Sequence, residues 1–359
     1  MELPTNVLFL EMMAVVKDKE EKGFSIVKKR ISTDLKDDEV LVKVSRASFC
    51  GTDSHIYNYD DWAKNRLTLP LTVGHEFSGE IIKVGTNVTN VKLGDVVSAE
   101  THIICNVCEF CLRGEGHVCE KTKIIGVDTD GCFAEYLKIP AANCFLNNKD
   151  INPLFLSVQE PLGNAVHTML HFDIKDKTVV ILGCGPIGLM GVDVSLAVGA
   201  KKVIAIEINE YRRNIAKKIG AHVVINPLEE DVIKRVLEET GGLGVDVVGE
   251  FSGNKGAVEQ AFKYVKKGGA MSILGIPHKP IQIDLANDVV FKGLSIYGVT
   301  GRRIYDTWYQ VKELVESGKL HLGDIITHQF KLKDINEAAE IMNSGNCGKI
   351  ILIPEDSNE

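Results

Sequence analysis

The sequence predicts an α/β protein of two domains, one mostly β and the other built on a doubly wound parallel sheet. Its 359 residues suffice for two domains of about 150 residues each. The hydrophobic content of 45% and the charged content of 25% are ordinary for globular proteins, so each domain is expected to bury a core. The pattern changes near residue 160, from short strands broken by turns to strands that alternate with helices.

The first 155 residues are expected to form mostly short strands. Residues 40–44 and 77–84 are strand candidates, because they are rich in β-branched and other apolar side chains. Gly85, Asn87 and the pair Gly94-Asp95 mark the turns that follow. This region therefore predicts the mostly-β domain.

Residues 160–300 carry the alternating pattern, with helical stretches such as 211–219 and 258–265. The strand-like runs occur at 178–182, 203–206, 223–225, 245–249, 270–274 and 295–299. This alternation implies a parallel, doubly wound sheet. A further helix at 306–317 and a strand at 349–353 follow. We expect them to return to the first domain, which gives domains of 1–158 with 301–359 and of 159–300.

Charge and hydropathy exclude several classes of partner. A net charge of −8 without a long basic run argues against a nucleic-acid partner. No apolar stretch approaches the roughly 18 residues that span a bilayer, so no membrane partner is expected. The apolar start is interrupted by Glu11 and lacks a basic leader, which predicts a cytoplasmic chain. In that reducing compartment, nine cysteines indicate metal binding or catalysis rather than disulfides.

A dinucleotide-binding fingerprint, G-x-G-x-x-G, occupies residues 183–188 between an apolar strand and an apolar helix at 189–198. Gly183 allows the tight turn, Gly185 lets a pyrophosphate approach the backbone, and Gly188 lets helix and strand pack closely. The N-terminus of the helix then faces the phosphate charge. The pattern predicts a nicotinamide dinucleotide as cofactor.

The choice between NAD and NADP depends on Glu207, 24 residues after Gly183. A carboxylate at the end of the second strand can accept both ribose hydroxyls and repels a 2′-phosphate, so NAD is favoured. Arg212 could cover the adenine or the ribose. Arg212 and Arg213 together leave NADP open as an alternative.

Four cysteines within fifteen residues form the strongest local motif, namely Cys105, Cys108, Cys111 and Cys119. Four thiolates can close a tetrahedral shell around one Zn²⁺ and leave no place for water, so we expect a structural zinc site. The loop is too short to bury a core of its own, so the metal would order it. An iron–sulfur cluster is the alternative to zinc, because cysteines at this spacing can also hold one.

A second, dispersed set of metal-binding residue types comprises Cys50, His75, Glu76 and Glu160. One thiolate, one imidazole and two carboxylates suffice for a zinc site with an open position. An open position lets zinc polarise an alcohol and lower the pKa of its hydroxyl. We therefore expect a catalytic metal here.

Together these motifs resemble the zinc-dependent medium-chain alcohol dehydrogenase family. The resemblance runs over essentially the whole chain, in the family's order, from Cys-Gly-Thr-Asp-x-His at 50–55 to the glycine fingerprint. Longer segments that carry it lie at 55–62, 74–77, 163–168, 251–253, 274–277 and 301–308. The resemblance implies a GroES-like catalytic domain and a Rossmann domain that binds NAD.

The resemblance also implies site residues. Cys50, His75 and Glu76 would hold the catalytic zinc, with Glu160 at or near it, and which carboxylate is the direct ligand stays open. Thr52 and His55 would relay the substrate proton to solvent. The positions that would contact NAD are Ile187, Glu207, Arg212, Leu274, Gly275, Ile276, Val299 and Thr300.

The implied activity is NAD-dependent oxidation of the C3 hydroxyl of L-threonine to 2-amino-3-oxobutanoate. Polyol or diol oxidation, of the sorbitol or 2,3-butanediol type, is the alternative within the family. A hypothesis from a different functional class is a non-enzymatic zinc-knuckle binding module. The net charge of −8 and the dinucleotide-binding fingerprint argue against it. The resemblance further implies two zinc ions per subunit and a homotetramer, with an apolar edge strand at 295–300 as a pairing candidate.

Overall fold

The computed structural model describes residues 7–354, which form two compact units. Unit 1 contains residues 7–160, 328–345 and 349–354, and unit 2 contains residues 161–327 and 346–348. Residues 301–327 thus group with unit 2, whereas the sequence analysis placed them in the first domain. Residues 1–6 and 355–359 of that expected domain lie outside the described residues.

Contacts that involve buried side chains explain why residues 301–327 group with unit 2. His321 donates from its backbone N to Asp193 at 2.7 Å, and its Nδ1 lies 2.9 Å from the same carboxylate. The aliphatic part of the buried Arg302 lies where a side chain at Gly163 would project. Asp193 and Gly163 both belong to unit 2, and sequence patterns do not reveal such distant pairings.

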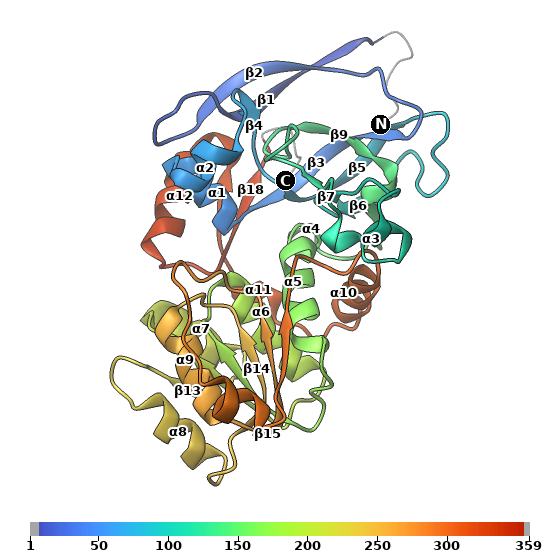
Figure 1. The fold of residues 1–359 in the computed structure, drawn as a ribbon. Coiled ribbons are helices and arrows are strands. Elements are labelled where there is room, and N and C mark those ends of the chain that lie inside the picture. Colours follow the sequence, from blue (N-terminus) through green and yellow to red (C-terminus); the bar gives the residue numbers. More distant parts are fainter. Residues whose placement is uncertain (1–6, 355–359) are drawn as a thin grey trace. The chain divides into compact units, whose positions relative to one another are not determined.

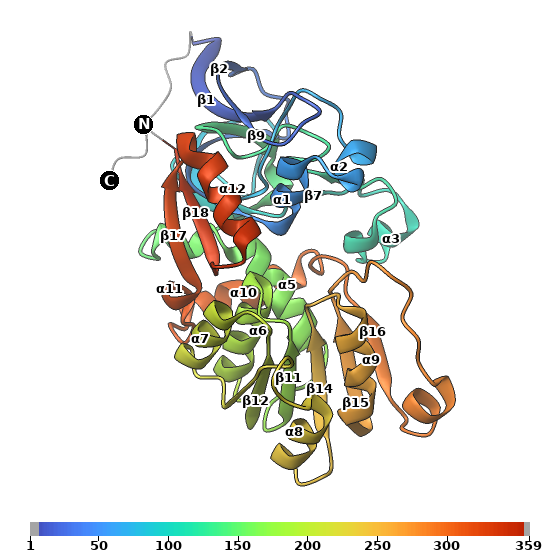
Figure 2. The same ribbon diagram turned by 90° about the vertical axis from the view of Figure 1, so that its left-hand side faces the viewer.

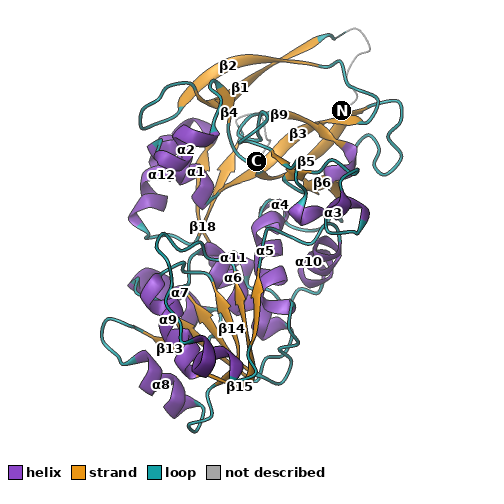
Figure 3. Ribbon diagram, viewed as in Figure 1, coloured by secondary structure: helices purple, strands orange, loops and turns teal. Residues whose placement is uncertain are grey.

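Unit 1 is mostly β (Figure 3). Its largest sheet has the order β10 (Cys144–Leu146), β6 (Val96–Ala99), β5 (Glu76–Val84), β3 (Glu39–Phe49), β18 (Lys349–Ile353) and β17 (Ile326–Lys331), with β9 (Tyr136–Pro140) also paired to β3. A second sheet contains β2 (Ser25–Ser32), β1 (Phe9–Lys17) and β4 (Leu71–Thr72), and β7 (His102–Ile103) pairs with β8 (Lys123–Ile124). The helices are α1 (Gly51–Asn58), α2 (Asp61–Arg66), α3 (Glu109–Leu112), α4 (Pro153–Leu156) and α12 (Ile335–Ser344). The strands predicted at 77–84 and 349–353 are confirmed.

Unit 2 is the predicted doubly wound domain. Its parallel sheet has the order β13 (Val223–Ile225), β12 (Lys202–Ile206), β11 (Thr178–Leu182), β14 (Val245–Glu250), β15 (Val265–Ile273) and β16 (Ser295–Gly298). Figure 2 shows β12, β11, β14 and β15 side by side in this order, and Figure 1 labels the connecting helices. The helices are α5 (Gln159–Leu170), which begins in unit 1, α6 (Pro186–Ala197), α7 (Glu210–Lys218), α8 (Val232–Glu239), α9 (Lys255–Tyr264), α10 (Asp306–Glu316) and α11 (Leu322–Ile325).

The core of unit 2 lies between the sheet and its helices. Val180, Ile204, Val248 and Met271 come from four neighbouring strands and belong to one buried apolar cluster with Phe262 of α9. Strands that are covered on both faces are continuously apolar, which is why the sequence predicted these strands.

Candidate metal centres and cofactor pocket

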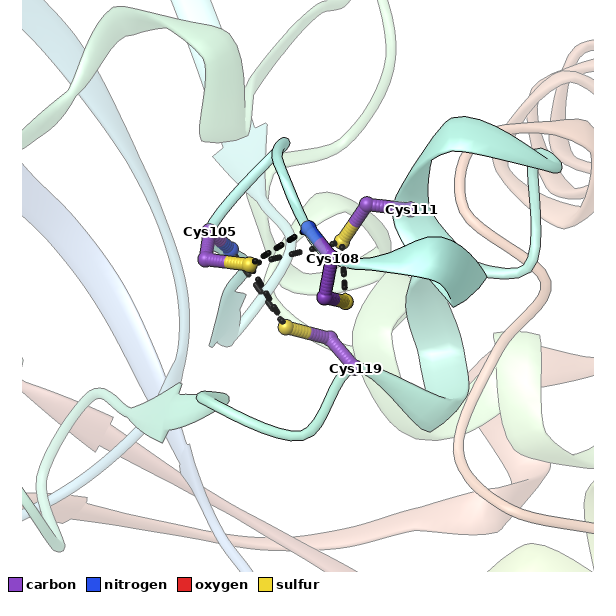
Figure 4. Close-up of side chains that lie close together, drawn as sticks. All are labelled: Cys105, Cys108, Cys111 and Cys119. Atoms are coloured by element: carbon purple, nitrogen blue, oxygen red, sulfur yellow. Dashed lines mark hydrogen bonds between the residues drawn. The ribbon is translucent and has the colours of Figure 1, made fainter.

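The four-cysteine lobe of unit 1 brings all four sulfurs together. The short β7–β8 ladder closes the base of the lobe, and α3 begins directly after Cys108. The Sγ atoms of Cys105 and Cys111 are 3.9 Å apart, and those of Cys108 and Cys111 are 3.5 Å apart. Cys119 Sγ lies 3.5 Å from Cys105 Sγ, and Figure 4 shows the four side chains converging.

These separations fit one tetrahedral metal ion. A Zn–S bond of about 2.3 Å implies S···S separations of about 3.8 Å, whereas a disulfide needs about 2.05 Å. Backbone N–H groups of Cys105 and Lys121 point to Cys119 Sγ, each at 3.4 Å. Burial raises the pKa of the Cys119 thiol, but these donors outweigh burial and lower it to about 6. Cys119 therefore favours the thiolate that a metal requires, whereas burial and the neighbouring thiols raise the pKa of Cys111 to about 12.

A second cluster contains Cys50, His75 and Glu76. Strands β3 and β5 pair so that Ser48 lies opposite Glu76, which places Cys50, two residues further on, beside the start of β5. One ligand atom from each of the three residues lies within 4.8 Å of the other two. Gly74 has φ +90°, and a Cβ there would overlap the Phe133 ring, so the turn before His75 requires glycine.

Buried polar atoms without partners indicate that this cluster accommodates a cation. His75 Nδ1, Glu76 Oε1 and Asp53 Oδ1 are buried and accept or donate no hydrogen bond. Asp53 Oδ1 lies 3.7 Å from His75 Nδ1, and Asp53 Oδ2 accepts from Cys50 N at 2.9 Å. Uncompensated buried groups are costly, so the set fits an ion that would complete it.

Negative groups gather around His75. Burial acts to lower the pKa of His75, but the charges of Asp53, Cys50 and Glu160 outweigh it and raise the value to about 10. Burial raises the pKa of Asp53 to about 6, although His75 opposes the shift. A bound cation would offset this concentration of negative charge.

The two carboxylate oxygens of Glu76 have different surroundings. Its Oε2 lies 2.5 Å from Lys349 Nζ and accepts from Ser48 Oγ, while Oε1 has no hydrogen-bond partner. Lys349 Nζ also donates to Phe49 O at 2.8 Å, and both charged side chains are buried. Glu160 is buried but falls outside the set that converges with Cys50. No sequence pattern indicated Lys349, which reaches Glu76 through the pairing of β18 with β3.

Thr52 and His55, the predicted relay pair, lie on α1. Cys50 is the N-cap of this helix, and the helix ends at Tyr59, whose φ is +47°. Residues three apart on a helix are neighbours on one face, which suits passage of a proton from one to the other. Thr52 is half-buried and His55 is exposed, so a proton that passes from Thr52 to His55 moves towards the solvent.

The glycine fingerprint in unit 2 has the predicted form. Gly183 has φ +89°, which favours glycine in the turn after β11. A Cβ on Gly188 would press into the Gly183 carbonyl, so close packing of helix and strand depends on it. At Gly185, the nearest atom to an added Cβ is Arg212 Nη1 at 4.0 Å. The backbone at the N-terminus of α6 is therefore open to a ligand.

A cavity of about 570 Å³ lies at this end of the sheet. Glu207 faces it from the end of β12, with Oε2 accepting from Cys184 N at 2.6 Å and Oε1 from Asn209 N at 2.8 Å. Arg212 Nε donates to Cys347 O at 3.2 Å. Four predicted cofactor residues line the cavity, namely Gly183, Gly185, Glu207 and Arg212.

The other predicted cofactor residues lie outside the lining of this cavity. Ile187 and Gly188 are on the first turn of α6, and the remainder follow the carboxyl ends of β15 and β16, namely Leu274, Gly275, Ile276, Val299 and Thr300. Ile276 is 83% exposed, which suits a ligand contact. Asn254, Gln260 and Tyr264 also line the cavity but were not predicted from the sequence. Asn254 follows the carboxyl end of β14, which is a signal that could have found it. Gln260 and Tyr264 lie on α9, where no local pattern marks them.

Comparisons with known proteins agree with this geometry. The sequence model of the alcohol dehydrogenase GroES-like domain matches residues 36–149, and that of the zinc-binding dehydrogenase domain matches residues 186–317. An L-threonine 3-dehydrogenase from Caldanaerobacter subterraneus subsp. tengcongensis is 53% identical over 344 residues, which cover 96% of this chain and 99% of that protein. The chain belongs to the zinc-dependent medium-chain alcohol dehydrogenase family.

Two further members of the family show how far the likeness extends. An L-threonine 3-dehydrogenase from Bacillus velezensis is 49% identical, with 96% of this chain and 99% of that protein covered. The crystal structure of 2R,3R-butanediol dehydrogenase from Bacillus subtilis is 28% identical, with a TM-score of 0.85, 96% of this chain and 100% of that chain covered.

Membership of the zinc-dependent alcohol dehydrogenase family confirms the predicted fold class and chemistry. The chain is an oxidoreductase that acts on CH–OH groups of a small-molecule substrate with zinc and NAD as cofactors. Within residues 7–354, none of the helices combines the length and apolar character needed to cross a bilayer.

Proposed function

We propose that this dehydrogenase oxidises the C3 hydroxyl of L-threonine to 2-amino-3-oxobutanoate, with NAD as hydride acceptor. The observation that carries the proposal is the 53% identity, over nearly its full length, to a protein named L-threonine 3-dehydrogenase. The butanediol dehydrogenase, which represents the alternative substrate class, shares the fold at 28% identity.

We assign the catalytic zinc to Cys50, His75 and Glu76, and the structural zinc to the four cysteines of the lobe. The converging ligand atoms of both clusters support this assignment. When bound, the catalytic ion supplies a Lewis acid that lowers the pKa of an alcohol, and NAD accepts the hydride. Asp53 faces His75 Nδ1, which leaves Nε2 for the metal.

The protein's own groups then handle the proton. We propose that Thr52 takes the hydroxyl proton of the substrate and passes it to His55, which releases it to solvent. The outward order of the two residues along α1 supports this direction. Glu160 contributes negative charge at His75, so we place its catalytic role beside the metal rather than among the ligands.

In the cofactor site, we propose that Glu207 accepts the ribose hydroxyls of NAD and that the open backbone at Gly185 receives the pyrophosphate. The cavity and the N–H donors that orient Glu207 support this arrangement. Arg213 Nη1 donates to the carbonyl oxygens of Glu207 and Ile208, so it is occupied with protein partners. The site therefore favours NAD over NADP.

We also propose a cytoplasmic homotetramer. All nine cysteines are free, as a reducing compartment requires. Strand β16 forms one end of its sheet, and its Ile296 side chain is 44% exposed, so this edge is open to pairing. Light scattering is expected to give four times the 39.4 kDa chain mass, and a mass near 39.4 kDa would reject the tetramer.

A substrate panel tests the proposed activity. Purified, zinc-loaded protein is assayed for NAD reduction with L-threonine, sorbitol and 2,3-butanediol. An amino-acid substrate needs anchors for a carboxylate and an ammonium group, whereas a polyol needs neutral hydrogen-bond partners. We expect the highest kcat/KM with L-threonine. A higher value with either polyol would transfer the assignment to the alternative class.

A further inference from the structure

The turn after α1 holds an acidic side chain against the exposed imidazole of that helix. His55 Nδ1 lies 2.5 Å from Asp60 Oδ2. The Trp62 ring stands beside the imidazole, with 6.0 Å between the ring centroids. His55 and Asp60 keep side-chain exposures of 50% and 39%. One ring nitrogen is therefore bound while part of the imidazole stays open to solvent.

Asp60 is itself held in place by a second bond. Its Oδ1 accepts from Ala63 N at 3.1 Å, which makes Asp60 the N-cap of α2. Its backbone N donates to His55 O at 3.4 Å, across the left-handed turn at Tyr59. The cap keeps the carboxylate from rotating away, so its other oxygen stays directed at His55 Nδ1.

Most of the other charged groups around α1 have recorded partners other than His55. Helices α2 and α12 pack against α1, and β1 contributes a lysine at the carboxyl end of the helix. The recorded pairs are Lys64 with Asp61, Arg66 with Asp128, Glu340 with Tyr57 and Lys22, and Lys17 with the carbonyl oxygens of Gly23 and Tyr57, and Glu337 is the other charged residue of α12. Among the described residues, Asp60 is the carboxylate recorded in contact with His55.

We propose that Asp60 is a positioning residue for the proton relay, because it accepts the Nδ1–H of His55 and leaves Nε2 as the proton acceptor. The inference rests on the relay proposed above. The hydroxyl proton of the substrate passes through Thr52 to Nε2, and the C3 hydrogen would leave with the electron pair of its bond as hydride, which bound NAD would accept. The imidazolium then releases its proton to water, and Asp60 stays ionised throughout.

The electrostatics agree with this arrangement. Burial acts to raise the pKa of Asp60, but the hydrogen bond with His55 and the backbone donors of α2 outweigh it and lower the pKa. A carboxylate beside the imidazole stabilises both the required tautomer and the cation that forms.

The variants Asp60→Asn and Asp60→Glu separate this role from helix capping. Asparagine caps a helix about as well as aspartate, but its NH₂ can donate to Nδ1 and thereby moves the ring proton to Nε2. We expect D60N to unfold at the same temperature as the wild type. We also expect it to lose about 10- to 100-fold in kcat, less than the roughly 10²- to 10⁴-fold that a complete acid–base step contributes, because His55 itself remains. D60E keeps the carboxylate, so we expect a kcat above that of D60N despite a weaker cap.

The pH profile supplies a readout that a capping role would not move. The carboxylate favours protonated imidazole, and the relay needs the unprotonated form. Removing the charge should therefore shift the acidic limb of the kcat profile to lower pH. Asp61→Asn is the matched control, since Asp61 is 96% exposed and pairs with Lys64. It should leave kcat and profile unchanged.

Two outcomes would overturn the proposal. One is a D60N enzyme with wild-type kcat and an unshifted profile. The other is a loss of kcat that follows thermal stability, so that D60E is worse than D60N. If the wild type oxidises another alcohol instead of L-threonine, the proposed substrate is wrong. The same comparison made with that alcohol still decides the role of Asp60.

Discussion

Replacing Glu207 with glutamine should weaken NAD binding and remove discrimination against NADP. Each carboxylate oxygen of Glu207 accepts one backbone N–H, from Cys184 at 2.6 Å and from Asn209 at 2.8 Å. A carboxylate offers about four acceptor positions, so about two remain for the ribose hydroxyls. Glutamine has one acceptor oxygen, and its NH₂ would face a backbone donor.

The expected magnitude follows from the charge on the acceptor. A hydrogen bond to a charged group contributes about 1.5–3 kcal/mol, against about 0.5–1.5 kcal/mol for a neutral pair. Weakening two ribose bonds by this difference costs about 2–3 kcal/mol, or about 30- to 150-fold in the Kd for NAD. The 2′-phosphate of NADP carries a charge of about −1.5 to −2. The E207Q variant no longer repels it, so NADP binding should become stronger.

Calorimetric titration of wild type and E207Q with NAD and NADP measures both effects. Glu210→Gln is the matched control, because Glu210 is an exposed carboxylate on the first turn of α7 and does not line the cavity. We expect E210Q to bind NAD like the wild type. An E207Q protein that keeps its NAD affinity, or still excludes NADP, would refute the assigned role of Glu207.

Three further substitutions test the metal centres. Cys111→Ser should remove the structural zinc and lower the unfolding temperature, and metal analysis that still finds two zinc ions per chain would contradict this. Asp53→Asn should weaken the catalytic zinc by about 10- to 100-fold in chelator competition, because it disturbs the partner of His75; unchanged affinity would argue against that contact. Lys349→Met leaves Glu76 buried without its cation, so urea unfolding of the zinc-free protein should show a loss of about 3–5 kcal/mol. The same substitution at the exposed Lys234 is the control. An equal loss of unfolding free energy at both sites would contradict the buried ion pair of Lys349 with Glu76.

The sequence predicted those features that depend on short-range pattern. The strand at 178–182 and the glycine turn at Gly183 were readable because burial on both faces and a positive φ restrict the residues allowed there. The cysteine lobe was readable because its four ligands lie within fifteen residues. The four cysteines without a metal role, Cys132, Cys144, Cys184 and Cys347, are buried, as free cysteines often are.

Features that depend on tertiary pairing were not predictable. The ion pair of Lys349 with Glu76 exists because β18 aligns with β3, and no local pattern specifies that register. Asp60 lies five residues from His55, but its contact depends on the left-handed turn at Tyr59. The grouping of residues 301–327 with unit 2 likewise depends on contacts such as that of His321 with Asp193.

The most direct test of the central claim is an NAD-reduction assay with L-threonine on purified protein of known zinc content. We predict threonine-dependent formation of NADH by protein that holds two zinc ions per chain. Protein with both zinc sites filled that binds NAD but forms no NADH from L-threonine would contradict the proposed function.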